Sequence, residues 1–248
     1  MKVALVTGAS SGIGAATARL LARRGWRVAV NYSKGKAQAD QVATECGEAI
    51  AVRGDVAEDA DCRRIAAETL AKWGRIDALV NNAGTTKAVK HADLEGLAAA
   101  DFERVFRVNV VGPFQMIRAC AAALKESRGA VVNVSSVAAL LGTGSSLAYA
   151  ASKAALDTMT FSLARTLAPE VRVNIVAPGY VSTPWQPAVH GEQGARALEE
   201  RYASIAPLRS AGTAEDVADA IAWLLEGARR VTGERIYVDS GIHIASPR

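Results

Sequence analysis

Three side chains in this sequence of 248 residues have the types and spacing that proton transfer requires. Tyr149 precedes Lys153 by four residues, which places both side chains on one face of a helix. A phenol with a pKa of about 10 is a poor acid or base near neutrality, unless an adjacent ammonium lowers its pKa. Ser136 lies 13 residues before Tyr149 and would donate to a developing oxyanion. By itself the Tyr149–Lys153 spacing is also typical of an exposed helical pair. The predicted elements around it are therefore needed to distinguish a proton-transfer pair from an exposed one.

Those elements alternate between short Val- and Ile-rich runs and Ala-rich helical stretches, without a linker between them. This rhythm predicts an α/β fold with a single-domain, Rossmann-like, doubly wound sheet of about seven parallel strands flanked by helices. Strands are predicted at Val3–Thr7, Arg27–Tyr32, Ala49–Arg53, Asp77–Asn81, Ala130–Ser135, Val171–Ala177 and Arg235–Asp239. Helices are predicted at Ile13–Arg24, Lys36–Cys46, Asp59–Lys72, Phe102–Ser127, Tyr149–Ala168 and Ala214–Glu226.

A glycine-rich turn joins the first predicted strand to the first helix. Glycine permits a positive φ and a close approach of the backbone to a ligand. The N-terminus of the following helix offers unpaired N–H groups to a pyrophosphate. The alternative is a turn with a purely structural role between strand and helix. The position of the glycine-rich turn after the first strand of a repeating βαβ chain favours a cofactor site. The cofactor contacts predicted here are Gly8, Ser10, Ser11, Gly12, Ile13 and Gly14.

The pattern TGxxxGIG at Thr7–Gly14 resembles the short-chain dehydrogenase/reductase family. The NNAG motif at Asn81–Gly84 and the set Ser136, Tyr149 and Lys153 extend the resemblance over essentially the whole chain. The resemblance implies hydride transfer between a nicotinamide and a carbonyl or secondary alcohol. Among the members of this family, the chain looks most like the 3-oxoacyl-acyl-carrier-protein reductases.

The same resemblance implies a role for each catalytic residue. Tyr149 would be the general acid/base, Ser136 would bond the substrate oxygen, and Lys153 would hold the ribose hydroxyls of the nicotinamide. Asn109 matches the family's fourth catalytic position, where Asn anchors a water leading to the lysine; the alternative is an Asn that satisfies local backbone. Ser135 competes with Ser136, but the interval to Tyr149 favours Ser136 and leaves Ser135 to bond backbone.

The end of the second predicted strand bears on the choice between NADP and NAD. A carboxylate there would bond the 2′-hydroxyl of NAD, and none is present. Asn31, Ser33 and Lys34 could donate to a 2′-phosphate, which favours NADP(H) over NAD(H), although Lys34 could equally be a solvated turn residue. Ser11 stands where NADP-dependent family members often carry Arg or Lys. The predicted contacts at this strand end are Asn31, Tyr32, Ser33 and Lys34.

Further contacts are expected where later strands end. Asn82 can support the central sheet through side-chain hydrogen bonds. The segment at Pro178-Gly179 resembles the family's PG segment, whose backbone frames the nicotinamide. Tyr180 and Trp185 would line the substrate pocket, with core packing as the alternative. The stretch 184–207 interrupts the strand–helix rhythm and is either a substrate lid or a surface insertion. The predicted cofactor contacts in these segments are Asp55, Val56, Asn82, Ala83, Gly84, Pro178, Gly179, Val181 and Thr183.

Composition limits the remaining possibilities. The net charge is +4 without a long basic run, so a nucleic-acid partner has no specific support. Three cysteines and three histidines show no metal-ligand spacing, and no metal is expected. No apolar run is long enough for a membrane span, and the strand that follows Met1–Lys2 leaves no room for a signal peptide. We therefore expect a cytoplasmic protein with reduced thiols.

Two functional alternatives remain open. The chain could be a non-catalytic dinucleotide sensor or scaffold, or an NAD-dependent alcohol dehydrogenase of the same family. The complete set of Ser136, Tyr149 and Lys153 argues against a sensor. The expected substrate is a small or acyl-carrier-bound carbonyl compound, and family resemblance implies a homo-oligomer, commonly a tetramer.

Overall fold

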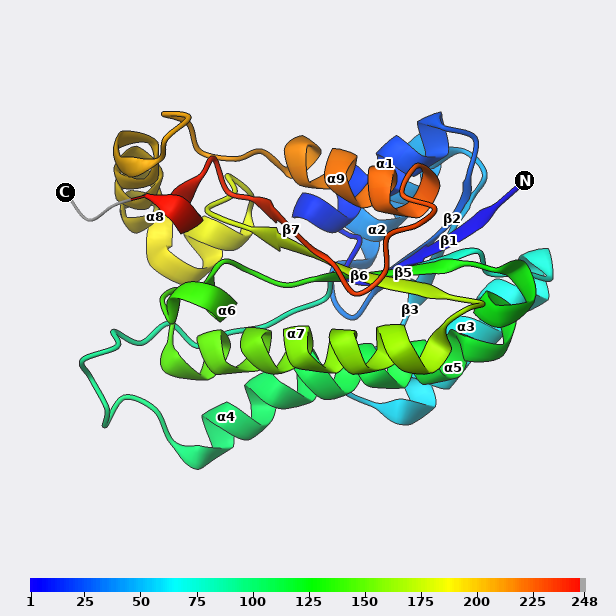
Figure 1. The fold of residues 1–248 in the computed structure, drawn as a ribbon, viewed down its shortest axis with the longest axis horizontal. Coiled ribbons are helices and arrows are strands. Elements are labelled where there is room, and N and C mark those ends of the chain that lie inside the picture. The colour runs from blue at the N-terminus through cyan, green and yellow to red at the C-terminus, as the bar shows by residue number, and fades with distance from the viewer. Residues whose placement is uncertain (246–248) are drawn as a thin grey trace.

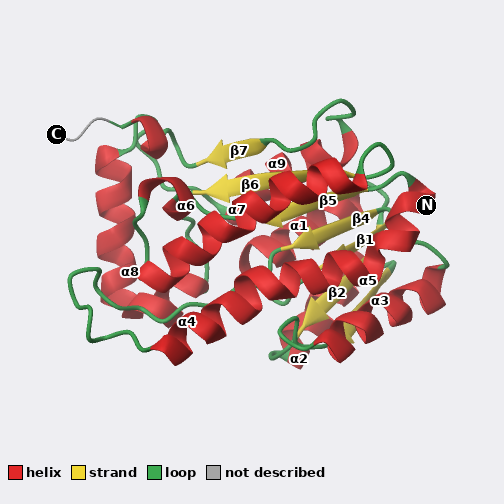
Figure 2. Cartoon of the chain, turned by 60° about the horizontal axis from the view of Figure 1, so that its bottom comes forward, coloured by secondary structure: helices red, strands yellow, loops and turns green. Residues whose placement is uncertain are grey.

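The computed structural model of the chain describes residues 1–245. A seven-stranded sheet forms its centre, with the order β3-β2-β1-β4-β5-β6-β7 and parallel pairing between all neighbours (Figures 1 and 2). The strands are β1 (Val3–Val6), β2 (Arg27–Tyr32), β3 (Ala49–Arg53), β4 (Ala78–Asn81), β5 (Ala130–Val134), β6 (Arg172–Pro178) and β7 (Arg235–Val238). The predicted Rossmann-like fold is therefore confirmed.

Helices cover both faces of this sheet. In Figure 1, α1, α2 and α9 lie above the sheet, and α3, α4, α5 and α7 lie below it. The helices are α1 (Gly12–Arg23), α2 (Lys36–Cys46), α3 (Asp59–Trp73), α4 (Ala99–Phe106), α5 (Gly112–Ser127), α6 (Ala138–Leu141), α7 (Leu147–Leu167), α8 (Trp185–Ile205) and α9 (Ala214–Glu226).

The continuous apolar runs of the strands follow from this double cover. Successive side chains of a strand point to opposite faces, so both faces need an apolar partner. In β1, Ala4 and Val6 pack in the same cluster as Leu21 of α1 and Ile221 of α9. Leu5 faces the other way and belongs to the cluster that contains Met116 of α5. The sheet therefore separates two cores, and its strand ends are left to carry polar groups.

The connection order creates a crevice at the centre of the sheet. The chain proceeds from β1 outward to β2 and β3, and then returns to place β4 on the other side of β1. The loops leaving β1 and β4 consequently diverge to opposite faces. Ligands bind at such switch points, outside the carboxyl ends of the strands.

The structure differs from the sequence-based expectation along the predicted helix Phe102–Ser127. The segment forms α4, a π-helical turn at Arg107–Val111, and α5. The wider turn contains Asn109, and the backbone N–H of Gly112 bonds the carbonyl of Arg107 five residues back. Periodicity of apolar residues does not reveal a single inserted residue, because the helix continues on both sides of it.

The segment predicted as a lid or insertion is largely helical. Trp185–Ile205 forms α8, which is interrupted by a kink at Gly191 with φ 72° and ψ 164°. Pro184 precedes its first residue, in the way that Pro favours a helix start. The short helix α6 was not expected either, and it precedes α7 directly.

Candidate active site

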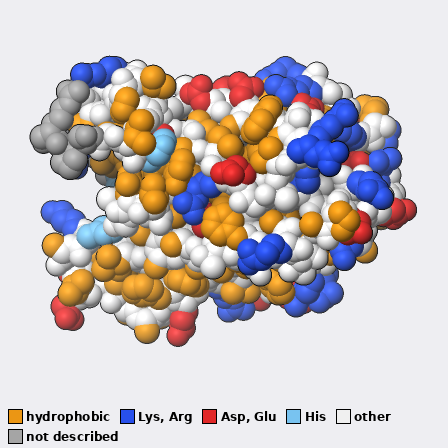
Figure 3. Space-filling view, viewed as in Figure 1, with side chains coloured by type: hydrophobic (Ala, Val, Ile, Leu, Met, Phe, Trp, Pro, Cys, Tyr) orange, Lys and Arg blue, Asp and Glu red, His pale blue; other side chains and the backbone are white. Residues whose placement is uncertain are grey.

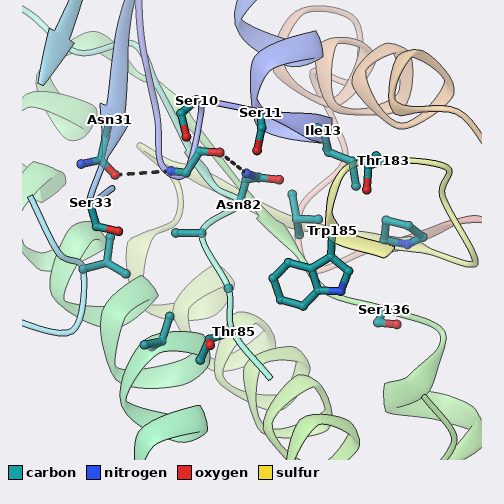
Figure 4. A pocket seen from close by; sticks show the side chains of 18 of the residues that line it. Ser10, Ser11, Ile13, Asn31, Ser33, Asn82, Thr85, Ser136, Thr183 and Trp185 are labelled. Carbon is teal, nitrogen blue, oxygen red and sulfur yellow. Dashed lines mark hydrogen bonds between the residues drawn. The ribbon is translucent and has the colours of Figure 1, made fainter. Parts of the chain in front are cut away.

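A cavity of about 610 Å³ opens at the carboxyl ends of the central strands. Its walls come from the turns after β1, β2, β3, β4, β5 and β6, and from α7 (Figure 4). Most of the residues proposed from sequence meet there: Gly8, Ser10, Ser11, Gly12, Ile13, Asn31, Tyr32, Ser33, Lys34, Asp55, Val56, Asn82, Ala83, Gly84, Ser136, Tyr149, Lys153, Pro178, Gly179, Val181, Thr183 and Trp185. Three residues, Gly14, Asn109 and Tyr180, lie behind the wall.

The turn between β1 and α1 has the shape of an anion cradle. Gly8 and Gly12 have φ of 61° and 53°, in the left-handed region that favours glycine. Ser11 is the N-cap residue of α1 and its side chain makes no capping bond. The first turn of the helix contains no acidic residue. Its free N–H groups and the hydroxyls of Ser10 and Ser11 therefore suit the pyrophosphate of a dinucleotide.

Asn82 locks the turn after β4 onto the glycine turn. Its Nδ2 donates to the carbonyl oxygens of Thr7 (3.0 Å) and Gly8 (3.1 Å). The Thr7 hydroxyl in turn accepts from the backbone N–H groups of Asn82 and Ala83, both at 3.0 Å. A Cβ on Gly8 would lie 2.9 Å from the Cα of Ala83. The two loops that flank the crevice are thus held in direct contact.

Asn31 has a structural role that differs from the expected one. Its side chain is buried, and Nδ2 donates to the carbonyl oxygens of Val52 (3.2 Å) and Gly54 (3.1 Å). Its Oδ1 accepts from the N–H of Gly8 at 3.4 Å (Figure 4). Because both amide hydrogens are used, Asn31 is not a donor to a 2′-phosphate. Ser33 and Lys34 remain exposed at the edge of the cavity.

The predicted proton-transfer residues converge on the opposite end of the cavity. Ser136 follows β5, while Tyr149 and Lys153 project from successive turns of α7. The Nζ of Lys153 lies 5.7 Å from the centroid of the Tyr149 ring and donates to the carbonyl oxygen of Val134 at 2.8 Å. The Ser146 hydroxyl caps α7 by accepting from the N–H of Tyr149 at 3.3 Å. The start of α7 is therefore fixed by a bond to the backbone of Tyr149.

Asn109 lies behind the cavity wall, at the end that contains Tyr149 and Lys153. Its Oδ1 accepts from the N–H of Thr85 at 2.8 Å, and Nδ2 donates to the Thr85 carbonyl and the Ser152 hydroxyl, each at 3.0 Å. A Cβ on Gly84 would lie 3.5 Å from Asn109 Oδ1 and 3.9 Å from Lys153 Nζ. Asn109 thus ties the loop after β4 to α7 beside Lys153. The π-helical turn is what aims this side chain inward.

The segment after β6 forms a further wall of the cavity. The N–H of Ser182 and the carbonyl of Tyr180 bond Gly212, each at 3.0 Å, which fixes the backbone that contains Val181. A Cβ on Gly12 would lie 3.4 Å from the Cβ of Thr183, so this segment reaches the glycine turn. The structure thereby brings Val181 and Thr183 to the expected place.

Trp185 and Tyr180 differ in their positions. Trp185 is partly exposed on the cavity wall (Figure 4). Tyr180 is buried: its hydroxyl donates to the carbonyl oxygen of Ala195 at 2.9 Å, and its ring lies 5.4 Å from that of Tyr202. Tyr180 therefore anchors α8 and does not line the substrate pocket.

Several lining residues were not anticipated. Thr85 directly follows the NNAG motif and could have been inferred from it. Arg104 and Val108 are four residues apart, on one face of the helical segment that precedes Asn109, and no motif marks them. The additional lining residues are Gly54, Thr85, Arg104, Val108, Val134 and Gln186.

Comparison with known proteins agrees with this geometry. A family model described as enoyl-(acyl carrier protein) reductase matches residues 8–243. A solved structure from Burkholderia xenovorans, assigned to the short-chain dehydrogenase/reductases, superposes with a TM-score of 0.92 at 39% identity, over 99% of both chains. The chain belongs to the short-chain dehydrogenase/reductase family. This family consists of oxidoreductases that bind a nicotinamide dinucleotide.

Curated relatives of this short-chain dehydrogenase/reductase include ketoacyl reductases. A protein of Streptomyces violaceoruber assigned as ketoacyl reductase 2 of the granaticin polyketide synthase is 41% identical, over 98% of this chain and 96% of its own. The 3-oxoacyl-acyl-carrier-protein reductase of Synechocystis is 37% identical, over 97% and 96% of the two chains. That of Staphylococcus aureus is 34% identical over 98% of each.

Burial dominates the electrostatics of the two α7 side chains. It raises the pKa of Tyr149 to about 12, with the neighbouring Ser136 hydroxyl acting in the opposite direction. It lowers the pKa of Lys153 to about 8, against the attraction of Asp157. The expected depression of the Tyr149 pKa by the ammonium is therefore not what the structure has: the phenol holds its proton firmly at neutral pH.

Residues 1–245 show neither a membrane-spanning helix nor a metal site. No helix in that range is both long and apolar enough to cross a membrane. The same range holds no group of three or more His, Cys, Asp or Glu side chains that could bind a metal ion.

The close packing behind the glycine turn leads to a first prediction. A Cβ on Gly14 would lie 2.5 Å from the Gly8 carbonyl oxygen and 2.6 Å from Asn82 Nδ2. We expect Gly14→Ala to lower the free energy of unfolding by about 1–3 kcal/mol, because backbone must move to admit the methyl group. Denaturant unfolding measures this loss.

Gly194→Ala is the matched control for this substitution. It also lies in a helix, but its Cβ would meet a single side-chain carbon, that of His190, at 3.2 Å. We expect this variant to be neutral or stabilised by up to about 1 kcal/mol. Equal stability of the two variants would show that the turn is not tightly packed.

Proposed function

We propose that the chain is an NADP(H)-dependent ketoreductase in which Tyr149 is the general acid/base. The observation that supports this most directly is the convergence of Ser136, Tyr149 and Lys153 on the cavity that also contains the glycine turn. When bound, the nicotinamide supplies or accepts the hydride. The protein's part is to orient the two reactants, exclude water and move one proton.

The residues divide that work according to their chemistry. In carbonyl reduction, Tyr149 donates its phenolic proton to the substrate oxygen as negative charge develops there. Ser136 donates a hydrogen bond to the same oxygen. Lys153 holds the ribose hydroxyls and stabilises the phenolate that remains. Because the pKa of Tyr149 is about 12, the resting site is in the protonated form that reduction requires.

The edge of the cavity at β2 supports NADP(H). Ser33 and Lys34 offer a hydroxyl and an ammonium there, and no carboxylate stands at the end of β2 to repel a 2′-phosphate. This proposal depends on these two residues alone, since the amide of Asn31 is already engaged. An NAD-dependent enzyme would need an acceptor other than a carboxylate at the end of β2 for the 2′-hydroxyl of NAD.

A carbonyl carried on an acyl carrier is the substrate class favoured by the names of the relatives. Exposed apolar side chains fit the approach of an acyl chain: Leu140 and Leu141 lie on α6, and Ile205 ends α8. Both helices border the notch at the left of Figure 3, seen from the same side in Figure 1.

Oligomerisation is proposed on similar grounds. Phe102, Val111 and Phe114 are partly exposed along α4, the π-helical turn and α5. Large apolar side chains along one connected helical segment favour burial against another subunit. We propose a homotetramer in which these helices pair, as the family resemblance implies.

Substitution of the proposed acid tests the mechanism. We expect Tyr149→Phe to lower kcat for ketone reduction by about 10²–10⁴-fold, the usual contribution of a positioned proton donor. The affinity for NADPH should change little, because the ring and its packing are kept. Steady-state kinetics and fluorescence titration measure the two quantities. Turnover like that of the wild type would exclude Tyr149 as the acid, and a protein that binds NADPH but reduces no ketone in its wild-type form would be a sensor.

The pKa of Lys153 leads to a pH prediction. Reduction needs the Tyr149 proton and the Lys153 ammonium, and both are present below the Lys153 pKa of about 8. We therefore expect kcat for reduction to be constant on the acid side and to fall as pH rises through about 8. Alcohol oxidation needs the phenolate and should be favoured by higher pH, because burial raises the Tyr149 pKa. A reduction rate that increases above this pH would contradict the assignment.

Cofactor choice is tested by reversing one charge. We expect Lys34→Glu to lower the preference for NADPH over NADH, measured as the ratio of kcat/KM values, by about 10–100-fold, equivalent to about 1.4–2.8 kcal/mol. Lys36→Glu is the control, because it makes the same charge change two residues away, where Lys36 pairs with Asp40. An equal effect of both variants would indicate general electrostatics and not a 2′-phosphate contact.

A further inference from the structure

A buried carboxylate lies one helical turn beyond Lys153. Asp157 is four residues further along α7 on the same inward face, and it is 1% exposed. Neither of its oxygen atoms accepts a well-directed hydrogen bond from any residue in the range 1–245. A buried carboxylate is costly unless a charge opposes it, so its place in the core requires an explanation.

Arg235 of β7 supplies one opposing charge. Its Nη2 lies 2.7 Å from Asp157 Oδ2. The guanidinium is held in place by a bond from Nη1 to the Tyr237 hydroxyl at 2.9 Å, and by the rings of Phe161 and Tyr237, whose centroids are each 5.8 Å away. The ion pair therefore connects the middle of α7 to the last strand of the sheet.

Lys153 is the second cation near Asp157: it lies one helical turn away on the same inward face of α7, without a direct ion pair to that carboxylate. It is 4% exposed, and its Nζ donates to the carbonyl oxygen of Val134, which has no net charge. The Ser135 hydroxyl donates to the Lys153 carbonyl at 3.4 Å, so β5 contributes only neutral groups here. A buried ammonium without a counter-charge loses its proton easily.

The groups around Lys153 can be assigned element by element. On α7 itself, Tyr149 and Asp157 flank it. From β5 it faces the Val134 carbonyl, the turn after β5 contributes the neutral hydroxyls of Ser135 and Ser136, and from β7 the guanidinium of Arg235 lies beyond Asp157. Arg104 of α4 contributes to the cavity wall. Asp157 is therefore the carboxylate that attracts Lys153, and the pKa of Lys153 would lie lower without it.

We propose that Asp157 is a positioning residue that keeps Lys153 protonated for proton transfer, and that Arg235 keeps Asp157 ionised. This inference rests on the proposed function of Tyr149 and Lys153. Burial raises the pKa of Asp157, while the Ser135 hydroxyl, Arg235 and Lys153 act against that rise. The three charges thus form a row, cation–anion–cation, whose last member reaches the active site.

The pH profile of Asp157→Asn tests the proposal. The amide keeps the shape of the side chain and removes its charge. We expect the alkaline fall of kcat for reduction to move to lower pH by about one unit, the size of the effect of one nearby charge. The rate would stay near that of the wild type on the acid side of the profile and would be about 5-fold below the wild-type rate at the wild-type midpoint.

A direct titration of Lys153 in the ligand-free protein gives a readout that does not depend on turnover. The ε-carbon signals of ¹³C-labelled lysine report the protonation of each amine, and Lys153→Met identifies the signal of Lys153 by its loss. We expect Asp157→Asn to lower the midpoint of this signal by the same amount as the kinetic shift.

Two further variants control the experiment. Asp219→Asn removes an exposed carboxylate from α9 and should leave both midpoints unchanged. If Asp157→Asn does not fold because Arg235 is left unpaired, the double variant Asp157→Asn/Arg235→Gln removes both charges. A smaller downward shift is then expected, because loss of the Arg235 cation also removes its repulsion of the Lys153 ammonium.

The outcomes separate the two proposals. A uniform loss of rate at every pH, with an unchanged Lys153 midpoint, would mean that Asp157 only stabilises the fold and would overturn this inference. If Asp157→Asn gives that result and Tyr149→Phe is inactive, the proposed function still stands. Full activity of Tyr149→Phe would reject the proposed function itself, whatever the Lys153 titration shows.

Discussion

The structure depends on the contact between the two loops that diverge at the centre of the sheet. Gly8 and Ala83 approach so closely that a single methyl group on Gly8 would lie 2.9 Å from the neighbouring Cα. Asn82 and Thr7 hold that contact with four hydrogen bonds between the loops. If these loops separated, the free N–H groups of α1 would no longer face the end of the cavity that contains α7.

The same contact explains the positions of the side chains farther away. Gly84 follows Ala83 directly and lies against both Asn109 and Lys153. Asn109 in turn bonds Thr85 and Ser152. The glycine turn and the residues proposed for proton transfer are thus joined through one continuous stretch of backbone after β4. Asn109 lies in the π-helical turn between α4 and α5, and both its amide oxygen and its amide nitrogen bond that backbone at Thr85.

Sequence predicted the architecture well, because parallel strands buried on both faces have to be continuous apolar runs. It also located Ser136, Tyr149 and Lys153, since their spacing fits a strand end followed by a helix. The role predicted for Asn31 was wrong. A residue type shows which hydrogen bonds a side chain can donate, but not which acceptors in the folded protein already use them. The two carbonyls that Asn31 bonds, those of Val52 and Gly54, belong to β3 and the turn after it. Only the folded sheet brings them within reach.

Similar reasoning explains why the row Lys153, Asp157 and Arg235 was not anticipated. A carboxylate eight residues after Tyr149 in a helix appears ordinary in the sequence, and three elements of the fold, β6, α8 and α9, separate it from Arg235. The register of β6 and β7, with Ile175 opposite Arg235, sets the guanidinium beside α7. Long-range electrostatic partners of this kind are determined by sheet order and register, which no local pattern encodes. In the proposed mechanism the proton affinity of Lys153 therefore depends on β7, the last strand within residues 1–245, although β7 does not line the cavity.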